Sequence, residues 1–163
     1  MAELLQNQMK ILFVCSANIS RSFLAEMLLR NEMEKLKLDN ISVTSAGLNA
    51  SPGNPPDPEM VSYLIKKDIP VKEHESKQIT EQVVDWADFI FIMEKDHQTT
   101  IEGTWPQAKG KVELLGKFIS GGPDPDDIVD PFRRSPYHYR LAQSQITLSI
   151  ESLVKQVILD QNA

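Results

Sequence analysis

The chain has one cysteine, no basic tract and no long apolar run. A single cysteine cannot form an intramolecular disulfide or a multi-cysteine metal site. The three histidines, His74, His97 and His138, are scattered without ligand-like spacing. We therefore expect no metal and no other cofactor. The net charge of −6 and the missing basic tract argue against a nucleic-acid partner.

No stretch of the sequence approaches the roughly 20 apolar residues that a membrane-spanning helix requires. The first eight residues, MAELLQNQ, are too polar for a secretory signal, and we interpret residues 1–8 as a flexible extension. With 163 residues, 41% of them apolar, the chain is typical of one globular domain, which we place at residues 9–160. We expect a cytoplasmic monomer without a membrane partner.

Short apolar segments alternate with segments of helical periodicity. We predict strands at residues 10–14, 41–45, 89–93 and 111–115, and helices at 22–38, 58–67, 80–87 and 95–102. Apolar residues at helical spacing between Ala142 and Val157 predict a last helix. This alternation predicts a single three-layer α/β domain, in which a central four-stranded parallel sheet carries helices on both faces. Ligands of such sheets bind beyond the carboxyl ends of the strands.

The first predicted strand is followed by the sequence CSANISRS, at residues 15–22. A helix that begins here directs unpaired N–H groups and the positive end of its dipole at the turn, which makes an anion site. The same dipole and the nearby Arg21 favour the thiolate of Cys15. The planar guanidinium also suits the oxygens of a phosphoryl group. We therefore predict that Cys15 attacks phosphorus, the alternative being an inert buried cysteine.

A long loop at residues 120–137 contains the sequence VDPF, in which Asp130 precedes Pro131. The proline stiffens the backbone, and the apolar neighbours of Asp130 could exclude water and raise the pKa of its carboxyl group. A carboxylic acid in that setting can protonate a departing oxygen. We predict that Asp130 is this acid, the alternative being a turn aspartate. Three other acids of the loop are interpreted as solvated: Asp124, Asp126 and Asp127.

Together these motifs resemble the low-molecular-weight protein tyrosine phosphatases. The sequence VCSANISRS is similar to the phosphate loop of this family, VC-x-x-N-x-x-RS, and VDPF is similar to its distal Asp-Pro acid loop. The similarity runs from about Lys10 to Lys155. It includes TSAG at 44–47, PPDPEMVSYL at 55–64, KQIT at 77–80, DFIFIME at 88–94 and KVELLG at 111–116.

The resemblance implies a protein-tyrosine-phosphatase that hydrolyses phosphotyrosine proteins through a cysteinyl-phosphate intermediate and releases inorganic phosphate. Cys15 would be the nucleophile, Arg21 the phosphate clamp, and Asp130 the general acid and later the base. The phosphate loop would supply backbone amides from Ser16, Ala17, Asn18, Ile19, Ser20 and Arg21, with a hydrogen bond from Ser22 to the thiolate. The resemblance also implies that Asn18, Ser45 and His74 support the loop, and that Ile19 and Phe132 line the substrate pocket.

The chain departs from the family at several positions. Ala17 replaces a usual glycine, and Ser20 replaces the second cysteine of many members, so no internal disulfide can protect Cys15. The common Asp-Pro-Tyr becomes Asp-Pro-Phe, followed by Arg133 and Arg134. These arginines are either charges at the rim of the pocket or a solvated pair.

Three other functions remain open. A protein arginine phosphatase also has an Asp-Pro-Phe loop, but its phosphate loop has threonine at the position of Ile19, and the hydrocarbon of Ile19 favours an aromatic leaving group. An arsenate reductase that uses an external thiol shares the fold, whereas the three-cysteine relay is excluded by the single cysteine. The third alternative is an inactive module that binds phosphoproteins.

Overall fold

The computed structural model describes residues 8–120 and 125–160. The predicted extension (all but residue 8) and Asp124 lie outside the described residues. Strands and helices alternate as the sequence predicts. In chain order the elements are β1 (Met9–Cys15), α1 (Arg21–Leu36), β2 (Ile41–Gly47), α2 (Pro58–Lys66), α3 (Glu81–Trp86), β3 (Phe89–Ile92), α4 (Lys95–Thr104), β4 (Val112–Leu114) and α5 (Pro136–Leu153). Two 3₁₀ turns, Pro106–Ala108 and Leu115–Phe118, flank β4, and a π-helical turn, Val154–Leu159, continues α5.

The four strands form one parallel sheet in the order β2-β1-β3-β4. β1 lies between two neighbours and pairs with β2 along its whole length, from Met9 opposite Ile41 to Cys15 opposite Gly47. Because its central residues are buried on both faces, the strand is an almost continuous apolar run. The predicted parallel sheet is therefore confirmed, and the predicted nucleophile lies at the end of one of its two inner strands.

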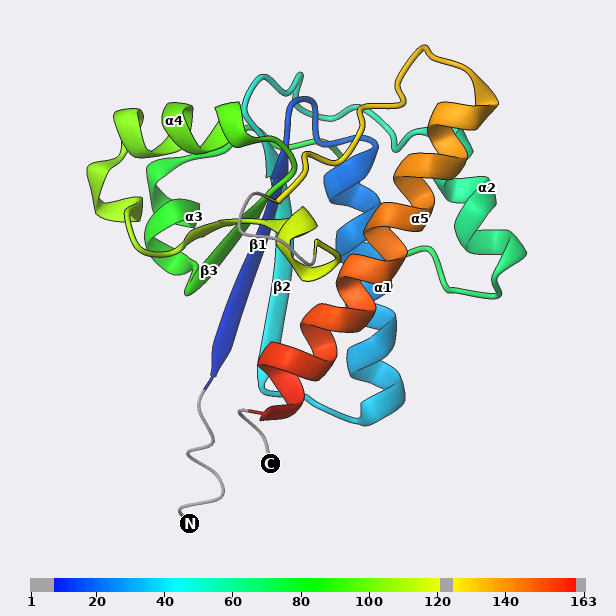
Figure 1. Cartoon of the computed structure of the whole chain (residues 1–163), viewed down its shortest axis with the longest axis horizontal. Helices are drawn as coiled ribbons and strands as arrows, with labels where there is room; N and C mark the ends of the chain where they lie inside the picture. Colours follow the sequence, from blue (N-terminus) through cyan, green and yellow to red (C-terminus); the bar gives the residue numbers. More distant parts are fainter. Residues whose placement is uncertain (1–7, 121–124, 161–163) are drawn as a thin grey trace.

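Helices cover both faces of the sheet, which confirms the predicted three layers (Figure 1). On one face, α1 and α5 bury Ile11 and Phe13 of β1, and α2 packs against these two helices. On the other face, α3 and α4 cover Leu12 and Val14. Each such apolar side chain contributes about 1.5–3 kcal/mol when fully buried. Alternate residues of β1 thus pack against the helices on both faces of the sheet and hold the strand in place below the β1–α1 turn.

Several predicted boundaries are shifted, by one or two residues at the ends of β2 and α4, and two of the shifts have a clear physical cause. α1 ends at Leu36, not at residue 38, because Lys37 adopts a left-handed φ of 56°. Lys37 N–H donates to the carbonyl of Glu34, and Leu38 N–H donates to the carbonyl of Met33. α5 begins at Pro136, inside the predicted loop 120–137. Proline is favoured at a first helical position, where its missing N–H removes no helical hydrogen bond.

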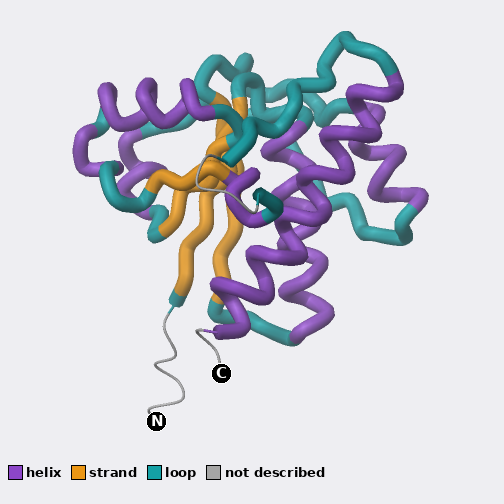
Figure 2. The backbone as a smooth tube through the Cα atoms, in the orientation of Figure 1, coloured by secondary structure: helices purple, strands orange, loops and turns teal. Residues whose placement is uncertain are grey.

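Several loops meet beyond the carboxyl ends of the strands, where Figure 2 shows the teal segments gathered. They include the β1–α1 turn and the loop that precedes α5. Within residues 8–120 and 125–160, no helix combines the length and apolar character needed to cross a membrane. The edge predicted to bind a ligand is thus formed by segments distant in sequence.

Candidate active site

The turn between β1 and α1, residues 16–20, directs its carbonyl groups outward and leaves its N–H groups unpaired. The carbonyl oxygens are satisfied by the surrounding chain: that of Ser16 accepts from Asn49 N–H at 2.8 Å, that of Asn18 from His74 Nε2 at 2.7 Å, and that of Ile19 from Asp57 N–H at 2.8 Å. In the part of the chain that the structure describes, no backbone N–H of residues 16–20 donates a hydrogen bond. Together with the amino end of α1, these donors form a nest of unpaired amides, a geometry that is suited to anions.

Asn18 holds the shape of this turn from inside the protein. It is fully buried and adopts a left-handed φ of 59°, a conformation that asparagine tolerates better than most residues. Its Nδ2 donates to the hydroxyls of Ser22 and Ser45, both at 2.9 Å, and its Oδ1 accepts from Lys77 N–H. The structure thus brings Asn18, Ser45 and His74 together behind the turn, as the resemblance implies.

A hydrogen-bond chain behind the turn directs a donor at the cysteine sulfur. Ser45 donates to the buried carboxylate of Glu26 at 2.6 Å, so its oxygen is free to accept from Asn18. Ser22 also accepts from Asn18, which leaves its own O–H for Cys15 Sγ, 2.9 Å away. Glu26 thus orients the hydroxyl of Ser45. The Asn18 amide is oriented by Lys77 N–H, which donates to its Oδ1. The sequence-based interpretation did not identify Glu26, although its position one helical turn after Ser22 places both on one face of α1.

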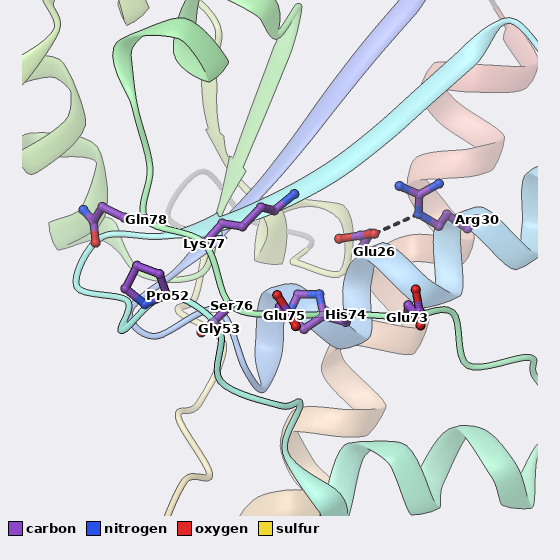
Figure 3. Close-up of a pocket in the computed structure, with 10 residues that line it drawn as sticks. All are labelled: Glu26, Arg30, Pro52, Gly53, Glu73, His74, Glu75, Ser76, Lys77 and Gln78. Atoms are coloured by element: carbon purple, nitrogen blue, oxygen red, sulfur yellow. Dashed lines mark hydrogen bonds and ion pairs between the residues drawn. The ribbon is translucent and has the colours of Figure 1, made fainter.

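Glu26 is itself held by Arg30, whose Nε donates to it at 2.8 Å (Figure 3). This pair lines a groove of about 830 Å³, together with His74 and other residues of the segment 73–78. Cys15 does not line that groove. The larger cavity thus adjoins the supporting network and not the reactive sulfur.

Arg21 is fixed in place by protein groups on two sides. Its Nη1 donates to the carbonyl of Ile128, and its Nη2 donates to Glu94, both at 2.8 Å. Arg21 is only 1% exposed, and the burial of its charge is tolerable because these partners satisfy the guanidinium. Sequence reasoning missed Glu94, although it follows β3 at the same sheet edge as Cys15.

His97 was also missed as a neighbour of this site. Its Nε2 lies 3.3 Å from Glu94 Oε2 and 3.5 Å from Ser16 Oγ. Burial lowers the pKa of His97 below its ordinary value, and the Glu94 carboxylate opposes that change. The lowered pKa favours the neutral form of the His97 ring, so Arg21 is the cation that pairs with the Glu94 carboxylate.

Asp130 faces Arg21 from the loop before α5. Its Oδ1 accepts from Phe132 N–H at 3.2 Å, and its Oδ2 lies 3.6 Å from Arg21 Nη2. The expected exclusion of water is wrong for this structure, because the Asp130 side chain is 50% exposed and Phe132 is 42% exposed. Of the apolar neighbours, Ile128 turns into the core instead of covering the carboxyl group.

The loop that carries Asp130 is anchored on both sides of Ile128. Ile128 N–H donates to the carbonyl of Met93, and Val129 N–H donates to Gln145. Asp126 and Asp127 are both exposed, as expected, and Asp127 also accepts a hydrogen bond from Lys95 N–H at 2.8 Å.

The predicted catalytic residues meet in one cavity of about 140 Å³. It is lined by Cys15, Ser16, Ala17, Ile19, Ser20, Arg21, Asp130 and Phe132. Ser20 has a buried hydroxyl without a hydrogen-bond partner in the described residues. Among residues 8–120 and 125–160, no group of three or more metal-ligating side chains is close enough to hold an ion.

The structure thus combines a lone cysteine at the end of an inner parallel strand with a nest of free amides and a fixed arginine, and these are the groups that an α/β domain needs to bind a phosphoryl group. A family model described as "Low molecular weight phosphotyrosine protein phosphatase" matches residues 10–162. The chain therefore belongs to this family of phosphatases.

Three similar proteins illustrate the range of substrates in the family. The chain is 32% identical to the protein-arginine-phosphatase of Bacillus subtilis, over 94% of this chain and 99% of that protein. It is 33% identical to the probable low molecular weight protein-tyrosine-phosphatase EpsP of Ralstonia nicotianae, over 90% of this chain and 94% of that protein. The solved structure of a Cys-to-Ser mutant of the YwlE arginine phosphatase, with a phosphorylated active-site serine, matches with a TM-score of 0.85 at 31% identity and covers 94% of this chain and 99% of that one.

Proposed function

We propose that the protein hydrolyses phosphotyrosine in proteins through a cysteinyl-phosphate intermediate. The observation that carries this proposal is the convergence of Cys15, Arg21 and Asp130 on one small cavity whose floor is a nest of unpaired amides. A phosphoryl group bound there meets a nucleophile, a fixed cation and a proton source at the same time.

In the first step the Cys15 thiolate attacks phosphorus, forming an S–P bond as the P–O bond to the phenol breaks. The free amides of residues 16–20 and the Arg21 guanidinium bind the equatorial oxygens, where charge accumulates in the transition state. Asp130 gives its proton to the departing phenolate oxygen. Its Oδ2 is the oxygen for this transfer, because Oδ1 is engaged by Phe132 N–H.

In the second step a water molecule attacks phosphorus, and the Asp130 carboxylate takes its proton. The S–P bond breaks, and the thiolate and inorganic phosphate are regenerated. Ser22 stabilises the thiolate as leaving group through its 2.9 Å contact with the sulfur. The phosphorylated active-site serine in the Cys-to-Ser mutant of the YwlE arginine phosphatase supports a covalent step in this reaction.

The walls of the cavity favour an aromatic leaving group. Ile19 and Phe132 line it with hydrocarbon, which suits a phenyl ring and offers no acceptor to a guanidinium. The arginine phosphatases among the relatives make phosphoarginine the second candidate.

A substrate panel tests the proposal. Matched peptides bearing phosphotyrosine, phosphoarginine or phosphoserine are incubated with the wild type, with Cys15→Ser as the background. We expect kcat/KM to be at least about tenfold higher for phosphotyrosine, because the hydrocarbon of Ile19 and Phe132 suits a phenyl ring better than a charged guanidinium. Ile19→Thr introduces a hydrogen-bond acceptor and should reduce the ratio of kcat/KM for phosphotyrosine to kcat/KM for phosphoarginine. A higher value for phosphoarginine in the wild type contradicts the assignment.

A further inference from the structure

The segment Pro131–Arg140 forms a basic ridge beside the catalytic cavity. It carries three of the five arginines of the chain and no carboxylate, in a protein whose net charge is −6. Arg133, Arg134 and Arg140 are all exposed. Within the described residues none of the three forms an ion pair, so their charges are available to a partner.

Both ends of the ridge are fixed to the catalytic machinery. At one end, Phe132 lines the cavity next to Asp130. At the other end, the Tyr139 hydroxyl donates to Asp57 at 2.7 Å, and Asp57 N–H donates to the carbonyl of Ile19 in the phosphate loop. The ridge is therefore held in a defined position relative to the reactive sulfur.

Arg133 places a charge next to Phe132, a residue that lines the cavity. Arg133 has a left-handed φ of 61°, which costs a residue with a Cβ about 1 kcal/mol and is usually left to glycine or asparagine. In this conformation its guanidinium carbon lies 5.3 Å from the centroid of the Phe132 ring. The Phe132 ring thus contacts the Arg133 guanidinium and also lines the cavity.

The first turn of α5 extends the positive surface. It contains no acidic residue, although acids are the residues that stabilise this end of a helix dipole. Tyr137, which is 60% exposed, and Arg140 lie one helical turn apart on it. Exposed aromatic and arginine side chains together are typical of surfaces that bind peptides.

We propose that this ridge binds acidic residues flanking the phosphorylated residue, so that the preferred substrates are phosphotyrosines within acidic segments. This inference rests on the proposed function, since it names the substrate class of the same site. The arginines attract carboxylates during encounter and hold them beside the cavity, while the remaining negative charge of the protein repels acidic segments that approach elsewhere.

Two phosphotyrosine peptides of identical length test the inference, one with aspartates and one with asparagines on both sides of the phosphorylated residue. At low ionic strength we expect kcat/KM to be about tenfold higher for the aspartate peptide, because several exposed charge pairs act together. The ratio should approach one at about 1 M salt, where screening is nearly complete.

Variants identify the residues responsible. Arg133→Ala/Arg134→Ala/Arg140→Ala should reduce the ratio to below about twofold. Lys109→Ala/Lys155→Ala removes two exposed cations elsewhere and should leave the ratio unchanged. Since each ratio compares two peptides on one enzyme, a change in the chemical step common to both cancels.

The outcomes separate the two proposals. Equal turnover of the two peptides by the wild type, or an undiminished preference in the triple variant, overturns this inference and leaves the proposed function intact. Absence of turnover on both peptides overturns the proposed function itself.

Discussion

Glu94 Oε2 lies 2.8 Å from Arg21 Nη2 and holds the guanidinium beside the phosphate nest. Glu94→Ala removes this acceptor and lets the arginine turn, and a misplacement of about 1 Å can cost about 100-fold. We therefore expect kcat/KM for phosphotyrosine to fall about 10–100-fold, with weaker inhibition by inorganic phosphate. Glu94→Gln retains an acceptor and should recover part of the loss. Glu113→Ala, which removes a surface partner of Lys117, is the control and should behave as the wild type.

Gly47 lies directly behind the phosphate loop, and no larger residue fits there. A Cβ at this position would lie 2.7 Å from Ser16 O and 2.9 Å from Asn18 N, so the loop backbone would have to move. Gly47→Ala should lower the free energy of unfolding by about 1–3 kcal/mol and abolish most phosphate binding. Urea denaturation and phosphate titration measure the two effects. Gly103→Ala in α4 meets no atom within 4 Å and should stabilise the protein by up to about 1 kcal/mol. If Gly47→Ala and Gly103→Ala changed the free energy of unfolding and phosphate binding equally, the proposed clash between a Cβ at position 47 and the loop backbone would be wrong.

Ser22 should control the reactivity of Cys15. Its hydroxyl lies 2.9 Å from the sulfur, and a hydrogen bond to a charged group contributes about 1.5–3 kcal/mol. Ser22→Ala should therefore slow alkylation of Cys15 by iodoacetate at pH 7 by about tenfold or more. Mass spectrometry of the single thiol gives the rate. Ser149→Ala removes a buried hydroxyl without a partner in the described residues and should leave that rate unchanged. An unaltered rate in Ser22→Ala would show that the serine does not stabilise the thiolate.

His97 should make stability depend on pH. Burial lowers the pKa of His97 in the folded protein below the ordinary value of about 6.5, so the unfolded chain binds a proton that the folded chain does not. Consequently the contribution of the neutral ring is fully present above about pH 6.5 and is lost as the pH falls toward the lower folded value. For this one group, the free energy of unfolding changes with pH by at most about 1.4 kcal/mol per pH unit.

Urea denaturation at pH 7.5 and pH 5.5 measures this effect. The wild type should lose more stability than His97→Gln over this interval. His138→Gln changes a less buried histidine at the start of α5 and should keep the wild-type dependence. If His97→Gln lost as much free energy of unfolding as the wild type between pH 7.5 and pH 5.5, groups other than His97 would cause the pH dependence.

The four parallel strands, the three layers and the convergence of Cys15, Arg21 and Asp130 could be anticipated from the sequence, whereas the order of the strands in the sheet was not predicted. Short, nearly continuous apolar runs alternate with segments of helical periodicity, and the two motifs that contain Cys15 and Asp130 are short and contiguous in sequence. The parallel connection of the strands then requires one common edge for the ligand.

The supporting residues could not be anticipated in the same way. Glu26 and Glu94 are charged residues in ordinary helical or loop contexts, and only tertiary packing turns them toward Ser45 and Arg21. The exposure of Asp130 was misjudged for a related reason. An apolar neighbour in sequence excludes water only if it faces the carboxyl group, and Ile128 faces the core.

Asp130 should matter most where the leaving group is poor. The phenol of tyrosine has a pKa of about 10 and departs slowly without a proton, whereas a strongly acidic phenol departs almost unaided. Asp130→Asn should therefore slow phosphotyrosine hydrolysis by about 10²–10⁴-fold. The loss on an activated aryl phosphate, measured as the burst of phenol release in the phosphorylation step, should be clearly smaller.

Asp126→Asn is the matched control, because Asp126 is an exposed acid of the same loop and should change rates by no more than a few-fold. Asp127→Asn is less suitable, because Asp127 accepts a hydrogen bond from Lys95 N–H and anchors the loop. Its effect should appear equally with good and poor leaving groups, since a displaced loop impairs every substrate. If Asp130→Asn instead lost activity equally on both substrates, Asp130 would act through position or charge and not as the proton donor.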